Sequence, residues 1–326
     1  INPYIKTVLL DAHHDVQPVG DINKWETDPF NPEIINGRLF GRGSGDNKAG
    51  VVIHHEVVKE LMKDLPVNIK IFIEGEEEIG SPCMAQFLDE FNKELEADVI
   101  VIADSGNIRI GTPTVTTSLR GLVDGFIEVD QPMRPVHSGV GGGVVPDAFM
   151  VLSKIIASFH NEKGELQIEG LTSSDMDVLE LKEEEIKKIF GSEDINLFEL
   201  DSISKRLWLE PALSILAIDA PSTKEAVNLV IPNAKAKVSL RLPPTEDPEH
   251  AMKMLEEHIM KNVPWGANVR FIPEAKGSGI VADPNKEFTK KLVQNFEEVF
   301  NTDAAYMGVG GSIPFANDFV EKFPNA

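Results

Sequence analysis

The chain has 326 residues, enough for one large domain or two domains of ordinary size. Its net charge of -22 argues against nucleic acid and anionic membrane surfaces as partners, because both select basic patches. No apolar run approaches the roughly 20 residues of a membrane span, and the single cysteine, Cys83, fits a reducing compartment, so we expect a cytoplasmic protein.

The first third of the chain alternates between short apolar segments and helical patterns. Strands are predicted at residues 5–10, 67–73 and 97–103, and the apolar spacing that follows Asp46 predicts a helix. Strand–loop–helix alternation of this kind predicts an α/β fold, with a mostly parallel sheet and helices on both faces.

The pattern changes after about residue 116. Two alternating segments, a further strand and two helices predict a separate α+β domain inserted at 117–272; these elements are expected at residues 122–129, 235–242, 269–272, 146–159 and 247–261. The chain then returns to an α/β pattern, so 1–116 and 273–326 are predicted to form one discontinuous domain. Both ends are abrupt, and we expect this domain to be truncated at each of them.

Polar residues follow the predicted strands of the first domain. His13, the acidic run 76–78 and Asp104 each come after an apolar segment, and Asp46 precedes a helix. In parallel sheets, ligands bind beyond the carboxyl ends of the strands, so these side chains are expected to converge. One imidazole and several carboxylates suit a pair of divalent cations, which can generate hydroxide at neutral pH and polarise a carbonyl. The first third of the chain therefore predicts a metallohydrolase.

Each motif also has a simpler interpretation. The His13-x-Asp15 pair would fit a polar turn, but a carboxylate two residues away commonly orients a ligating imidazole. The acidic run would fit a solvated strand end, whereas adjacent Glu77 and Glu78 would allow one to bind metal and the other to move a proton. His137 would fit either a turn residue or a hydrogen-bond donor to an oxyanion.

Other catalytic motifs are excluded. The glycine turn at residues 41–46 lacks the Gly-Lys-Ser/Thr ending of a phosphate-binding loop, and neither His-Glu-x-x-His nor Gly-x-Ser-x-Gly is present. His-His-Asp also stands where a nucleotide-binding oxidoreductase would carry its glycine fingerprint. Arg241 lies inside a predicted strand, and a lone Arg there suggests an anionic partner such as a substrate carboxylate.

Taken jointly, these motifs resemble the M20 family of metallopeptidases, in particular its dipeptidase branch, which includes the carnosinase-like enzymes. The matching stretches run in family order across almost the whole chain, at residues 13–18 (HHDVQP), 36–50 (NGRLFGRGSGDNKAG), 74–82 (EGEEEIGSP), 102–105 (IADS), 118–121 (SLRG), 137–143 (HSGVGGG), 228–232 (NLVIP) and 310–314 (GGSIP).

The resemblance implies two divalent metal ions. Asp46 would bridge them, His13 and Asp104 would complete one site, and Glu78 would serve the other. Zn is favoured by the ligand types, and the carboxylate-rich set also suits Mn.

The resemblance also implies catalytic roles. Glu77 would be the general base, and Asp15 would orient His13. The inserted domain would act as a lid and form a homodimer, in which His137 would reach the active site of the partner subunit and stabilise the oxyanion.

Substrate-binding residues follow from the same resemblance. Asn228 and Arg241 would hold the substrate, with Arg241 on its terminal carboxylate, and Gly311 and Ser312 would line the pocket.

The chain departs from the family pattern at several positions. Asn47 and Ala49 replace the second and fourth residues of the usual Asp-Asp-Lys-Gly motif, and the retained Asp46 makes both changes tolerable. The family carries a leading helical segment before the first strand, which is absent here, and a further metal-binding His near its C-terminus. The sequence stops at Ala326 before any such residue, so we expect a fragment with one complete metal site.

The expected function is therefore hydrolysis of dipeptides by metal-activated water. One alternative is an amidohydrolase of the same superfamily that acts on N-acyl amino acids. The other alternative is a non-catalytic binding protein that keeps the fold, although the retained Glu77 argues against it.

Overall fold

The computed structural model describes residues 2, 4–311 and 313–326, which divide into two compact units. Unit 1 consists of Ile1–Gly106 and Ile313–Ala326, and unit 2 is Asn107–Ser312. These limits differ from the predicted 117–272, because strands on both sides of that segment pair with one another in unit 2. The assignment of 117–272 as an inserted lid domain stays a prediction.

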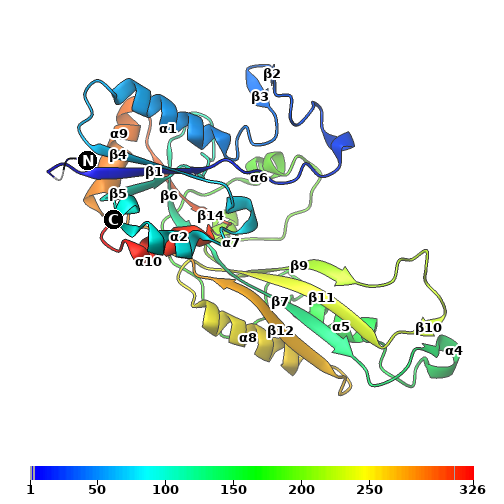
Figure 1. The fold of residues 1–326 in the computed structure, drawn as a ribbon. Helices are drawn as coiled ribbons and strands as arrows, with labels where there is room; N and C mark the ends of the chain where they lie inside the picture. The colour runs from blue at the N-terminus through cyan, green and yellow to red at the C-terminus, as the bar shows by residue number, and fades with distance from the viewer. Residues whose placement is uncertain (1, 3, 312) are drawn as a thin grey trace. The chain divides into compact units, whose positions relative to one another are not determined.

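Unit 1 is built on a short parallel sheet. Strand β1 (Thr7–His13) lies between β4 (Asn68–Glu74) and β5 (Val99–Ile102), and it is parallel to both (Figure 1). The side chains of Leu9 and Leu10 are buried, as expected for a central strand. This arrangement confirms the predicted α/β fold with a parallel sheet.

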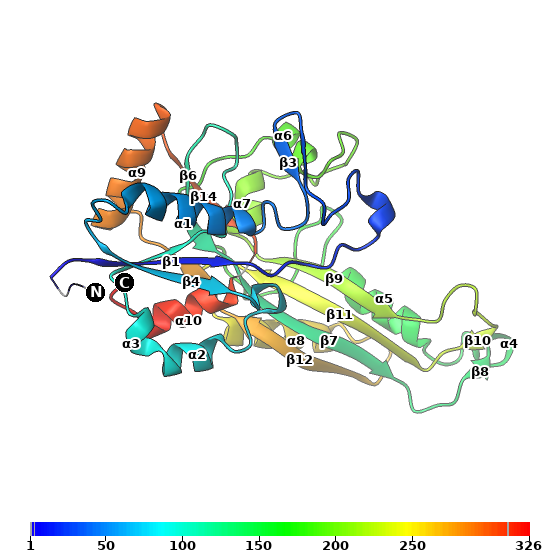
Figure 2. The same ribbon diagram turned by 45° about the horizontal axis from the view of Figure 1, so that its top comes forward.

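Helices cover both faces of this sheet (Figure 2). Helix α1 (Lys48–Leu61) lies on one face, and α2 (Met84–Glu90), α3 (Asn92–Leu95) and α10 (Pro314–Lys322) lie on the other. The second group packs on β1 through a cluster of apolar side chains formed by Leu9, Met84, Leu88, Leu95, Phe315, Phe319 and Phe323. Burial of this cluster fixes the strand whose last residue is His13.

Shorter elements complete unit 1. They are the 3-10 helices η1 (Ile22–Lys24) and η2 (Glu77–Ile79) and the hairpin strands β2 (Glu33–Ile35) and β3 (Arg38–Phe40).

Unit 2 contains a four-stranded antiparallel sheet. Its strands run in the order β12 (Val269–Gly277), β7 (Gly121–Asp130), β11 (Asn233–Leu242) and β9 (Ala212–Asp219). Helices α5 (Ala148–Ser158) and α8 (Pro248–Lys261) pack on one face and share a single apolar core with it. Buried residues of β7 alternate with half-exposed ones, as the alternation of apolar and polar residues at 122–129 predicted.

Unit 2 also contains a second, smaller sheet. In it β6 (Thr114–Leu119) lies between β13 (Ile280–Val281) and β14 (Ala305–Val309). The remaining elements are the helices α4 (Ser138–Gly141), α6 (Glu183–Ile189), α7 (Ile203–Trp208) and α9 (Glu287–Phe300), and the paired strands β8 (Val136–His137) and β10 (Leu229–Val230). Among the described residues, no helix has the length and apolar character that a membrane crossing requires.

The buried carboxylate of Glu246 accepts three hydrogen bonds within unit 2. Its carboxylate accepts hydrogen bonds from the Thr172 backbone N–H (2.9 Å), the Thr172 hydroxyl (2.7 Å) and His250 Nδ1 (2.7 Å). Burial opposes its ionisation, but these hydrogen bonds outweigh burial and lower the pKa of Glu246. We therefore expect Glu246→Gln to lower the free energy of unfolding by about 1.5–3 kcal/mol, because its amide group cannot accept from every donor. Urea denaturation checks this, with the exposed Glu249→Gln as the control; equal losses would contradict the expectation.

His258 makes the stability of unit 2 depend on pH. Its ring stacks on Phe159 with centroids 5.2 Å apart, and Nε2 lies 3.0 Å from the Ser158 hydroxyl. Burial lowers the pKa of His258 below 6.5, so the unfolded chain binds this proton more readily than the folded one. The free energy of unfolding should then fall as the pH drops below about 6.5.

His258→Gln should remove part of this pH dependence, because glutamine keeps a polar group near Ser158 but does not titrate. Thermal unfolding between pH 7 and pH 5 measures the difference, with His55→Gln on α1 as the control for an exposed imidazole. Parallel curves for the wild type and His258→Gln would refute the expectation.

Candidate metal centre

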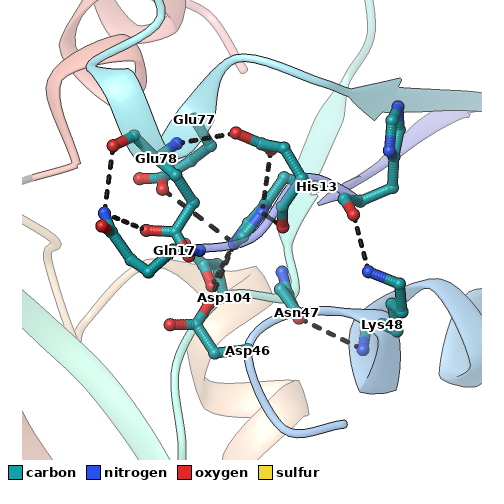
Figure 3. Close-up of polar contacts among 11 residues, drawn as sticks. His13, Gln17, Asp46, Asn47, Lys48, Glu77, Glu78 and Asp104 are labelled. Carbon is teal, nitrogen blue, oxygen red and sulfur yellow. Dashed lines mark hydrogen bonds and ion pairs between the residues drawn. The ribbon is translucent and has the colours of Figure 1, made fainter. Parts of the chain in front are cut away.

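Three of the four predicted metal ligands lie together at the carboxyl edge of the parallel sheet. His13 is the last residue of β1, Asp104 lies two residues beyond β5, and Asp46 lies two residues before α1. One ligand atom from each residue lies within 4.8 Å of the others (Figure 3). The sheet and the start of α1 therefore bring together groups that are far apart in sequence.

The two nitrogens of His13 face different partners. Nε2 lies 3.0 Å from Asp46 Oδ1, 3.5 Å from Asp104 Oδ1 and 4.0 Å from Glu77 Oε2. Nδ1 lies 3.2 Å from both the backbone oxygen and a carboxylate oxygen of Asp15. The Asp15 oxygens are acceptors, so Nδ1 can donate a hydrogen bond to Asp15 while Nε2 points to the carboxylates.

The carboxylates of this centre repel one another. Burial, with the Asp46 and Glu78 carboxylates, raises the pKa of Asp104 to about 6. Burial and Asp104 raise the pKa of Glu77 to about 7. Burial disfavours charge on His13, but the neighbouring carboxylates outweigh it and raise the pKa of His13. A cation among these groups would relieve their repulsion.

The adjacent Glu77 and Glu78 have different surroundings. Glu77 is 15% exposed and faces His13, as its 4.0 Å contact shows. Glu78 lies outside the group of three ligands, and both of its carboxylate oxygens accept hydrogen bonds from Gln17, whereas its backbone N–H donates to Asp15 Oδ2. The turn thus gives the two carboxylates different partners.

Sequence reasoning missed two polar residues next to this centre. Asp11 is 1% exposed, its Oδ2 has no hydrogen-bond partner among the described residues, and burial followed by the Glu74 carboxylate raises its pKa to about 8. A single Asp next to an apolar run does not indicate that its side chain is buried beside the metal centre. Gln17 belongs to the motif at residues 13–18, and its place in the loop after His13 is the signal that could have indicated a role at this centre.

The predicted catalytic and substrate residues of unit 2 lie on several elements. His137 ends β8 and is exposed, and Asn228 precedes the paired strand β10. Arg241 lies in β11 opposite Leu122 of β7. Gly311 follows β14 and is exposed, whereas Ser312 lies outside the described residues.

His137 also shows the turn contact that its simpler interpretation predicted. Its Nδ1 accepts a hydrogen bond of 3.1 Å from the Gly139 backbone N–H. A neutral imidazole that accepts at Nδ1 carries its proton on Nε2. The capping contact therefore leaves Nε2 as a donor, and the two interpretations are compatible.

Comparisons with known proteins identify the family. The profile of Peptidase family M20/M25/M40 matches residues 9–321. The chain belongs to this peptidase family. The resemblance to M20 peptidases that the motifs indicated is thereby confirmed.

Several M20 dipeptidases are similar to this chain. A cysteinylglycine-S-conjugate dipeptidase of Corynebacterium striatum is 32% identical over 98% of this chain and 72% of its own length. A β-Ala-His dipeptidase of Homo sapiens is 31% identical over 79% of this chain and 54% of its own length. The structure of the dipeptidase Dug1p from Saccharomyces cerevisiae has a TM-score of 0.82 and 25% identity, and the match covers 99% of this chain and 72% of that chain. The predicted dipeptidase branch is therefore also confirmed.

Proposed function

We propose that this M20 chain is a dipeptidase that uses two divalent metal ions. The observation that carries the proposal is the group of His13, Asp46 and Asp104 at the carboxyl edge of the sheet. The similarity of the chain to a cysteinylglycine-S-conjugate dipeptidase and a β-Ala-His dipeptidase supports dipeptides as the substrate class.

The donor set of the centre fits divalent cations. One imidazole nitrogen and several carboxylate oxygens suit Zn, and the carboxylate-rich composition also suits Mn. His13 and Asp104 would hold one ion, Glu78 the other, and Asp46 would bridge them. Asp46 has a side chain that is 72% exposed, which leaves this ligand open to an incoming ion. When bound, the ions supply Lewis-acid polarisation and lower the pKa of a water molecule.

The residues around the ions would move protons and hold charge. Glu77 lies beside His13 and would take a proton from the attacking water and deliver it to the leaving amine. Asp15 would hold the proton of His13 on Nδ1, which keeps Nε2 directed at the centre. His137 would donate from Nε2 to the oxyanion that forms at the scissile carbonyl.

The same proposal gives roles to the remaining predicted residues. Arg241 would bind the terminal carboxylate of the dipeptide, because a guanidinium suits bidentate contact with a carboxylate. Asn228, Gly311 and Ser312 would line the substrate pocket. Segment 117–272 would act as a lid and join two copies into a homodimer in which His137 serves the partner's site. The cytoplasmic location expected from the sequence also stays a prediction.

A substrate panel tests this function. Metal-stripped protein is resupplied with Zn or Mn and offered Cys-Gly, β-Ala-His, other dipeptides and a matched set of N-acyl amino acids. Hydrolysis of dipeptides alone is the expected result. Turnover restricted to N-acyl amino acids would replace the proposal with an amidohydrolase, and metal binding without any turnover would favour a binding protein.

A further inference from the structure

Gln17, in the loop after β1, donates hydrogen bonds to Glu78 from both its backbone and its side chain. The Gln17 backbone N–H donates to Glu78 Oε1 at 3.0 Å, and the side-chain Nε2 donates to Oε2 at 2.7 Å (Figure 3). The same Nε2 lies 3.1 Å from the Glu78 backbone oxygen. Both oxygens of one carboxylate are thus held by a single residue that is 61 positions away in sequence.

Asp15 holds the backbone of the same residue. Its Oδ2 accepts from the Glu78 N–H at 3.0 Å, and its Oδ1 lies 3.2 Å from His13 Nδ1. The backbone of Glu78 is therefore tied, through one carboxylate, to the imidazole of the group of three ligands. Asp15 thus fixes the backbone of Glu78, and the hydrogen bonds from Gln17 restrict its side-chain torsions.

The hydrogen bonds from Gln17 leave some lone-pair positions of the Glu78 carboxylate unused. An ionised carboxylate has two oxygens and about four lone-pair positions, so each oxygen of Glu78 can accept from Gln17 and still face a cation. Carboxylates that bind metals are commonly held by such hydrogen bonds, and loss of these outer partners typically costs about 10- to 100-fold in metal affinity.

We infer that Gln17 is a positioning residue for the second metal ion: it orients the Glu78 carboxylate toward the centre before that ion binds. This inference rests on the proposed two-metal function. The two ions should therefore depend differently on the loop that contains Gln17. His13, Asp46 and Asp104 form their group without Gln17, whereas the Glu78 carboxylate is held by it. Gln17 has no proposed contact with the substrate or with a metal ion.

The test measures metal uptake rather than activity. Metal-stripped Gln17→Ala is titrated with Zn in competition with a chromophoric chelator, beside the wild type and Gln167→Ala. Gln167 is an exposed residue of unit 2 whose Nε2 also donates to a backbone oxygen, so it controls for loss of a surface amide. We expect Gln17→Ala to weaken one of two Zn equivalents by about 10- to 100-fold, with the other unchanged and Gln167→Ala like the wild type.

A second variant separates orientation from folding. Gln17→Glu keeps the length of the side chain but replaces the donor by a carboxylate that repels Glu78, so the same equivalent should weaken further. Thermal unfolding of the metal-free proteins checks that they fold alike. Unchanged affinity of both equivalents, or tighter binding in Gln17→Ala, would overturn the inference while leaving two-metal uptake by the wild type intact. Uptake of only one equivalent by the wild type would instead contradict the two-metal function, and this inference with it.

Discussion

Glu77→Gln is expected to lower kcat for dipeptide hydrolysis by about 10²- to 10⁴-fold, the usual contribution of a general base. Glutamine keeps the shape of the side chain next to His13 but does not take a proton from water. The variant should still bind metal, because Glu77 lies outside the group of three ligands. Steady-state kinetics on the best dipeptide of the panel, with metal content measured on the same samples, give the result.

The matched control for this variant is Glu76→Gln in the same acidic turn. Glu76 is the residue that precedes the 3-10 helix η2 and has no proposed role in catalysis, so the activity of Glu76→Gln should remain within a few-fold of the wild type. An equal loss in both variants would mean that the turn is merely sensitive to charge. Full activity of Glu77→Gln would remove Glu77 from the mechanism.

His13→Ala is expected to weaken metal binding by more than the roughly 10- to 100-fold that outer partners cost, because it removes a proposed ligand itself. His13 is the sole imidazole in the group of three, and its Nε2 is within 4.0 Å of three carboxylates. Its loss leaves Asp46 and Asp104 to repel each other without a nitrogen donor. Isothermal titration with Zn measures the change.

His14→Ala is the control for this measurement, because His14 is the exposed residue next to His13, just past the end of β1. Its metal affinity should match the wild type. If His13→Ala bound Zn as tightly as His14→Ala does, the group at the end of β1 would not be the metal centre.

The parallel sheet of unit 1 was predictable because its strands are apolar runs that end in loops. The first strand nevertheless continues to His13, past the predicted end at residue 10, since Asp11 and His13 keep pairing with Phe72 and Glu74 of β4. Polar residues are unusual in a buried strand, and no local pattern signals that they remain in it. This extension places His13 on the sheet edge itself rather than in the following loop.

The division into units was less predictable. Strand β6 pairs with β13 and β14, which lie more than 150 residues later in the chain, and such long-range pairing has no local signature. Strand β9 was also missed, because its outer residues Leu216 and Ile218 are exposed and interrupt the expected alternation.

The candidate site was predictable where chemistry and position coincided. His13, Asp46 and Asp104 each lie at the end or start of a regular element, so topology brings them together. The contacts between Gln17 and Glu78 were not predictable, because they depend on the path of two loops and on side-chain conformation.

Metal dependence of dipeptide hydrolysis tests the central claim most directly. Chelator-stripped protein is titrated with Zn, and hydrolysis of the preferred dipeptide is followed at each ratio of metal to chain. The account predicts no hydrolysis without metal and an increase with added Zn that reaches a maximum. Full hydrolysis by the stripped protein, or saturation with Zn and no hydrolysis of any dipeptide, would contradict it.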